Sequence, residues 1–158
     1  MYHGRWYAVH TMQDELQPST STSVLLGYAP MDTIHAEFDE LVRASRASSD
    51  ADFHARLLPL IAHLKAHFGE EDAWMRETSF PPGDCHIDEH AAVLRSAAEV
   101  EPLVAAGNVR VGRSFVEELA RWFPGHADYL DSALAAWMCK RQYGGKPVVI
   151  QRRKDRSA

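Results

Sequence analysis

Four long segments carry apolar residues at helical spacing, and short breaks rich in proline, glycine or serine separate them. We expect helices over residues 31–47, 52–78, 84–106 and 111–141, because apolar residues that recur every three or four positions line one face of an α-helix. The apolar residues that we expect to face the core from the last segment are Phe115, Leu119, Trp122, Tyr129, Leu130, Leu134 and Met138. No segment predicts a strand. Four helices joined by short connections are typical of an all-α, up-down-up-down antiparallel four-helix bundle.

The bundle is expected to span residues 24–142, between an N-terminal arm at 1–23 and a short C-terminal tail at 143–158. The arm is aromatic but aperiodic and ends in a run of small polar residues, which is typical of a flexible segment. His3 and His10 lie in this arm and are interpreted as surface residues.

Composition and charge limit the class of protein. The net charge is -5, and the hydrophobic share of 46% with a charged share of 25% is typical of a globular protein. The only basic cluster, Arg152-Arg153-Lys154 with Arg156, is interpreted as a solvated tail, so no nucleic-acid partner is expected. No apolar run reaches the roughly 18–20 residues that cross a bilayer, and the N-terminus does not resemble a signal peptide. We therefore expect a cytoplasmic protein without a membrane partner.

Residues that can bind metal fall on or beside the apolar faces of all four expected helices. A buried imidazole or carboxylate is costly unless it is paired or bound to a metal. One such residue is usually a hydrogen-bonded core histidine, but a set spread over four helices is better explained by one shared metal centre. The members of this set are His35, His67, Glu71, His86, His90, His126 and Asp131.

The donor types indicate which kind of centre this is. Five imidazoles supply five nitrogen donors, and two bridging carboxylates supply four oxygen donors. A bridging oxide or hydroxide fills two more places, so one of the twelve positions around two six-coordinate ions stays open for a small diatomic molecule. Mixed imidazole and carboxylate ligation suits iron, while zinc and manganese remain alternatives on donor type.

The motifs that contain these residues resemble the hemerythrin family, in particular its single-domain bacterial members. The run 26–35, which ends at His35, is similar to the family's entry into its first helix. The motif H-F-x-x-E-x-x-x-M matches at 67–75, H-x-x-x-H at 86–90, and W-x-x-x-H-x-x-x-x-D at 122–131. The resemblance covers roughly residues 25–138.

The resemblance implies two iron ions with a bridging oxide or hydroxide, and reversible binding of dioxygen at the open position. It also implies a dry apolar pocket around that position. Phe38, Phe68 and Trp122 each lie within a turn of a candidate ligand and are expected to line it, although plain core packing is compatible with the same pattern. The implied roles are His86, His90 and His126 on the coordinatively full iron, His35 and His67 on the open one, and Glu71 and Asp131 as bridges.

The spacing of His126 and Asp131 predicts an irregular fourth helix. They are five residues apart, which is about 140° around an ideal α-helix, so they do not share a face. Pro124-Gly125 directly precedes His126 and favours a distortion there. A π-type turn would align the two side chains, and such turns favour functional sites.

Three other residues receive weaker interpretations. His63 is interpreted as a hydrogen-bond partner that orients a ligand or as a surface residue, with direct ligation as a third alternative. Cys85, beside His86, is interpreted as a half-buried structural thiol, with a redox-sensitive thiol as the alternative. His54 is expected to be exposed to solvent.

The leading functional hypothesis is reversible binding of dioxygen for storage, delivery or sensing. The alternative is a di-iron enzyme that acts on peroxide or nitric oxide, or a protein that repairs iron–sulfur clusters. A third possibility is iron storage or a purely structural metal. The sequence shows no acid–base residue near the open position beyond the ligands, which favours binding over turnover.

Overall fold

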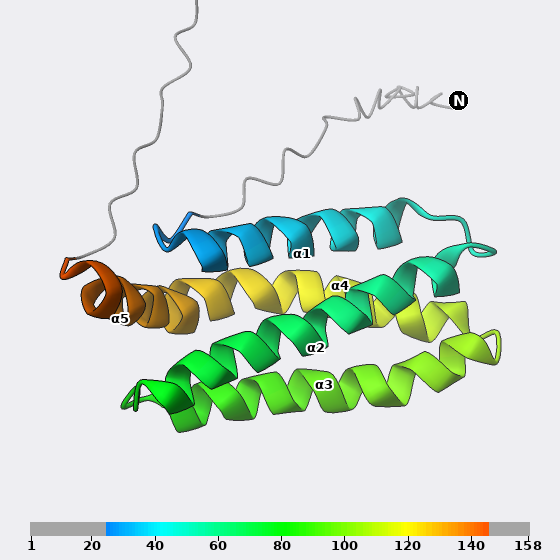
Figure 1. The fold of residues 1–158 in the computed structure, drawn as a ribbon. Helices are drawn as coiled ribbons and strands as arrows, with labels where there is room; N and C mark the ends of the chain where they lie inside the picture. The colour runs from blue at the N-terminus through cyan, green and yellow to red at the C-terminus, as the bar shows by residue number, and fades with distance from the viewer. Residues whose placement is uncertain (1–24, 146–158) are drawn as a thin grey trace, which may run out of the picture.

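A computed structural model describes residues 25–145, which form helices and contain no strand. Helices α1, α2 and α3 run in alternating directions, and α4, the π-helical turn η1 and α5 follow without a break as the fourth rod of the bundle (Figure 1). The arm predicted at 1–23, with His3 and His10, lies outside the described residues, as does the tail beyond residue 145. The bounds are α1 Ala29–Ala47, α2 Phe53–Glu77, α3 Gly83–Ala105, α4 Val109–His126, η1 Ala127–Asp131 and α5 Ser132–Tyr143.

Helices that follow one another in the sequence are neighbours in space. Helix α1 packs on α2, α2 on α3 and α3 on α4, and α1 also contacts α4, which closes the bundle. Gly112 allows α4 to approach closely, since a Cβ there would overlap the Phe53 ring and the Val104 side chain. The predicted all-α four-helix bundle is confirmed. In the part of the chain that is described, no helix is long and apolar enough to cross a membrane.

The entry into α1 is fixed by one carboxylate. Asp32 accepts hydrogen bonds from the backbone N–H groups of Leu26 (2.7 Å) and Gly27 (3.0 Å). Gly27 has φ +84°, a conformation that costs glycine little. Pro30 lies in the first turn, where its missing N–H leaves no helical bond unmade.

Besides Pro124 near the end of α4, two prolines lie inside helices without ending them. Pro59 neither delays nor interrupts α2, and Pro102 does not end α3, which continues to Ala105. Each proline removes one hydrogen bond to the carbonyl four residues earlier. Both prolines lie on exposed faces, as do Ala55 and Ala98, so water can solvate the released carbonyls.

The apolar core is divided by a polar layer. One apolar cluster contains Phe38, and the other contains Met31, while His35 lies between them on the same face of α1. The same order recurs along α2, where Glu71 separates the two clusters. The candidate metal ligands therefore lie within the core, with apolar side chains above and below them.

The fourth rod differs from the single helix predicted at 111–141. It begins at Val109, and the π-helical turn η1 interrupts it. Tyr129 was expected in the core but is 82% exposed, so that prediction is wrong. A π-helical turn contains an extra residue, which changes the face presented by the residues around it. Leu134 and Met138, also predicted to face the core, are buried.

Candidate metal centre

The structure brings all seven candidate ligands together in the polar layer. None of the seven is more than 4% exposed. They form two overlapping groups, and within each group the donor atoms all lie within 4.8 Å of one another. The three-histidine group consists of His86, His90, His126, Glu71 and Asp131, and the two-histidine group consists of His35, His67, Glu71 and Asp131.

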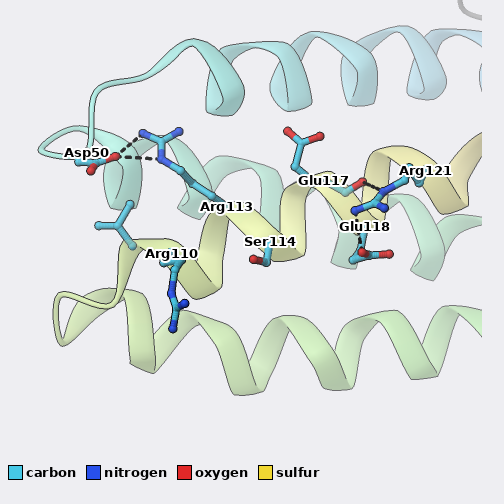
Figure 2. Close-up of a pocket in the computed structure, with 8 residues that line it drawn as sticks. Asp50, Arg110, Arg113, Ser114, Glu117, Glu118 and Arg121 are labelled. Carbon is cyan, nitrogen blue, oxygen red and sulfur yellow. Dashed lines mark hydrogen bonds and ion pairs between the residues drawn. The ribbon is translucent and has the colours of Figure 1, made fainter.

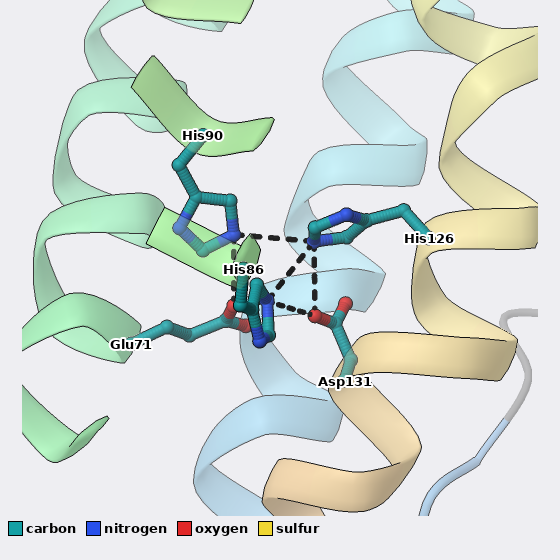
Figure 3. Close-up of side chains that lie close together, drawn as sticks. All are labelled: Glu71, His86, His90, His126 and Asp131. Carbon is teal, nitrogen blue, oxygen red and sulfur yellow. Dashed lines mark hydrogen bonds and ion pairs between the residues drawn. The ribbon is translucent and has the colours of Figure 1, made fainter. Parts of the chain in front are cut away.

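In the three-histidine group, the Nε2 atoms point to a common centre (Figure 3). His126 Nε2 lies 3.2 Å from His86 Nε2 and 3.1 Å from His90 Nε2. Asp131 Oδ1 lies 2.9 Å from His86 Nε2 and 3.1 Å from His126 Nε2. Glu71 Oε2 completes the group, 3.4 Å from His90 Nε2 and 3.5 Å from His86 Nε2.

The two-histidine group uses the other oxygen of each carboxylate. Glu71 Oε1 lies 3.0 Å from His67 Nε2 and 3.6 Å from His35 Nε2. Asp131 Oδ2 lies 3.1 Å from His35 Nε2. Each carboxylate therefore offers one oxygen to each group, which is the arrangement that a carboxylate needs in order to bridge two metal ions.

The donor atoms are poorly satisfied by the protein alone, which fits a metal centre. Nδ1 of His90 and of His126 each lie against a carboxylate, which can only accept, so each ring carries its hydrogen on Nδ1. In the form that binds metal, the Nε2 lone pairs of these two rings face each other at 3.1 Å, an unfavourable contact unless a cation lies between them. Both oxygens of Asp131 and Oε2 of Glu71 are also buried without a hydrogen-bond partner among the described residues.

The charges in this layer hold one another in their ionised forms. Burial lowers the pKa of His35 and of His86, but the carboxylates of Asp131 and Glu71 outweigh it and raise each pKa to about 9. Burial raises the pKa of Asp131, yet the imidazoles of His126, His35 and His86 beside its oxygens hold that pKa well below its usual range. The carboxylates are therefore anionic at neutral pH and attract cations.

The π-helical turn aligns His126 with Asp131. His126 ends α4, and Asp131 is the last residue of η1. Their side chains approach to 3.1 Å although they lie five positions apart in the sequence. The predicted non-ideal geometry between Trp122 and Asp131 is confirmed, and it places the second shared carboxylate in the centre.

Aromatic rings surround the histidines unevenly. Phe68 stacks on His90 at 4.1 Å and lies 5.0 Å from His67 between ring centroids, while Phe38 lies 6.4 Å from His67. Trp122 packs 4.3 Å from His126, on the three-histidine side. Trp122 also lines a small apolar hollow of about 130 Å³ between α3 and α4.

Phe123 is the aromatic neighbour of the two-histidine group that the sequence analysis missed. Its ring meets His35 edge-on at 5.0 Å and packs 4.2 Å from Phe38. It also lies 6.2 Å from His67. The signal was available, because Phe115, Leu119 and Phe123 recur every four residues and all three are buried.

His63 lies beside the centre but in neither ligand group. Its side chain is 11% exposed, its ring is 5.5 Å from that of His67, and its Nδ1 is 3.7 Å from a carboxylate oxygen of Glu37. That burial does not fit a surface residue, while a role in orienting a ligand stays a prediction. His54 is only partly exposed and lies 3.0 Å from Glu101. Cys85 is exposed, so the predicted half-buried thiol is wrong.

Two carboxylates outside the candidate ligand set contact Nδ1 of candidate ligand histidines, on the side of the ring away from the centre. The sequence did not predict either contact. Asp72 Oδ1 lies 2.7 Å from Nδ1 of His90, and Glu89 Oε2 lies 2.8 Å from Nδ1 of His126. Asp72 directly follows Glu71 in the sequence and Glu89 directly precedes His90, but the histidine that each one contacts is on another helix. Contacts between helices cannot be read from spacing within one helix.

A larger hollow of about 470 Å³ lies on the surface along α4, away from the buried centre (Figure 2). Its charged groups are largely paired with one another. Arg113 lies 2.7 Å from Asp50, and Arg121 lies 2.7 Å from Glu118. This mixed, open surface offers no concentration of metal donors.

The fold and the buried donors define a four-helix-bundle protein whose histidines and carboxylates form a candidate metal site. Comparison with known sequences agrees. The sequence profile of the hemerythrin HHE cation binding domain matches residues 26–138, and the chain belongs to the hemerythrin family. A bacteriohemerythrin of Ralstonia nicotianae is 41% identical over 121 residues, which cover 77% of this chain and 88% of the relative. No solved structure gives a significant match.

Proposed function

We propose that this chain is a non-heme di-iron protein that binds dioxygen reversibly. The observation that carries the proposal is the sharing of both oxygens of Glu71 and of Asp131 between the two groups of histidines. His86, His90 and His126 would hold one iron, and His35 and His67 would hold the other. Family membership and the name of the bacteriohemerythrin relative support this assignment.

The unequal number of histidines supports dioxygen binding at one iron. If two six-coordinate ions shared both carboxylates and one bridging oxide or hydroxide, three histidines would complete the positions of one ion, whereas two histidines would leave one position of the other ion open. Two ferrous ions held there would supply the electrons that dioxygen accepts when it binds. The open position is therefore assigned to the side of His35 and His67.

The chain itself would keep water from this position. Phe38, Phe68 and Phe123 pack around the two-histidine group, and each of their side chains is at most 8% exposed. Such a wall favours reversible binding, because excluded water limits side reactions. Trp122 would shield the three-histidine side.

The optical spectrum of the reduced, iron-loaded protein tests this proposal. We expect a charge-transfer band that appears in air and bleaches under vacuum through several cycles. Rapid, irreversible conversion to the diferric protein would contradict a carrier and favour an enzyme that acts on peroxide or nitric oxide. Binding of iron with no response to dioxygen would instead indicate storage or a structural role.

A further inference from the structure

The two groups differ in the contacts that their histidines make through the outer ring nitrogen, Nδ1, which faces away from the centre. In the three-histidine group, Asp72 and Glu89 lie within hydrogen-bond distance of the outer nitrogens of His90 and His126, while Nδ1 of His86 is buried without a hydrogen-bond partner among the described residues. In the two-histidine group, Nδ1 of His67 is buried and has no hydrogen-bond partner among the described residues. The carboxylates near His35 lie on its inner nitrogen, Nε2.

A carboxylate behind a ligand histidine changes the ligand in two ways. It fixes the tautomer, so that the Nε2 lone pair faces the metal, and it restrains the rotation of the ring. It also makes the imidazole a stronger donor, because the negative charge polarises the Nδ1–H bond. His90 is further fixed by Phe68, whose ring stacks on it with an interplanar angle of 6°.

We propose that Asp72 and Glu89 are positioning residues that make the three-histidine group the tighter metal site, which fills before the two-histidine group. This inference rests on the proposed two-metal centre. Each carboxylate joins two elements: Asp72 of α2 holds a ligand of α3, and Glu89 of α3 holds a ligand of α4. The contacts thus also fix the spacing of the three helices that supply this half of the centre.

The two carboxylates are expected to differ in strength. The Asp72 side chain is 17% exposed, whereas that of Glu89 is 48% exposed. Water competes more effectively for an exposed carboxylate and screens its charge. Replacement of Asp72 should therefore weaken metal binding more than replacement of Glu89.

A titration of the metal-free protein with Co(II), against a competing chelator, tests the inference. The wild-type chain is expected to bind two ions in two resolved steps. Asp72→Asn keeps the shape and an acceptor oxygen but removes the charge, and we expect it to weaken the first step by about 10–100-fold. Glu89→Gln should weaken the same step by a smaller factor, and the second step should change much less in both variants.

Neighbouring carboxylates provide matched controls. Glu70→Gln and Asp88→Asn remove the same charge at exposed positions on the same two helices. Thermal unfolding of the metal-free variants checks that each one folds. In addition, the Nδ1 protons of ligand histidines give shifted NMR signals in a Co(II) protein, and Asp72→Asn and Glu89→Gln should each move a different one.

The outcomes separate this inference from the proposed function. A selective loss in the first step, absent from both controls, would support it. Equal weakening of both steps, or an effect no larger than in the controls, would overturn it. If the wild-type chain bound a single ion, the two-metal centre would fail, and the effect of Asp72→Asn on that one ion would still decide whether the carboxylate positions a ligand.

Discussion

Phe123 offers a test of how the apolar wall supports the centre. Its side chain is 8% exposed and contacts both His35 and Phe38. Truncation of a buried phenylalanine to alanine costs about 3–5 kcal/mol, from lost burial and the cavity that remains. At about 2–4 °C for each kcal/mol in a chain of this size, Phe123→Ala should lower Tm by on the order of 10 °C. Denaturant and thermal unfolding measure this loss.

Phe115 provides the matched control on the same helix. It is 9% exposed, so Phe115→Ala should cost a similar free energy of unfolding. Among the described residues, however, no ring contact joins it to a histidine. We therefore expect both variants to lose stability and only Phe123→Ala to shorten the lifetime of the oxygenated protein in air. Equal lifetimes in the two variants would refute the idea that Phe123 protects the open position.

Three further predictions concern the fold and the thiols. Gly112→Ala should lower the free energy of unfolding by about 1–3 kcal/mol, because the new methyl group overlaps Phe53; an unchanged denaturation midpoint would contradict this. Gly69→Ala should instead raise it by about 0.5–1 kcal/mol, since nothing lies within 4 Å of the added group and alanine favours a helix; a loss of stability would contradict the open space there. In the native protein, a thiol reagent should modify the exposed Cys85 quickly. It should modify Cys139 only on unfolding, because this thiol is buried and burial raises its pKa; fast modification of both thiols would show that α5 opens readily.

The helices and the burial of the candidate ligands could be predicted because both follow from local spacing. A ligand that lies within an apolar stripe is placed in the core by the same periodicity that places its neighbours there. His35, between Met31 and Phe38, is the clearest case. The need to satisfy several buried polar groups at once then pointed to one shared centre rather than separate hydrogen bonds.

The irregular turn marks where local spacing fails. The sequence predicted it from the five-residue interval between His126 and Asp131, and the structure contains the π-helical turn. Its effect on neighbouring residues was not foreseen, so Tyr129 was wrongly assigned to the core. One extra residue in a turn changes which side chains face inward, and periodicity alone does not reveal the new face.

Contacts between helices account for the other omissions. Asp72 and Glu89 look like ordinary charged residues on amphipathic helices, and only the packing of α2 on α3 and of α3 on α4 brings them to His90 and His126. The exposure of Cys85 has a similar origin, because it depends on how the first turn of α3 meets its neighbours.

Iron content measured on the wild-type chain and on Glu71→Ala tests the central claim most directly. If Glu71 offers one oxygen to each group, the anaerobically loaded wild-type protein should hold two irons per chain. The folded variant should retain only one, because each group loses a donor and the two-histidine group has fewer ligands left. One ion per wild-type chain, or two retained irons in the variant, would contradict a centre built on shared carboxylates.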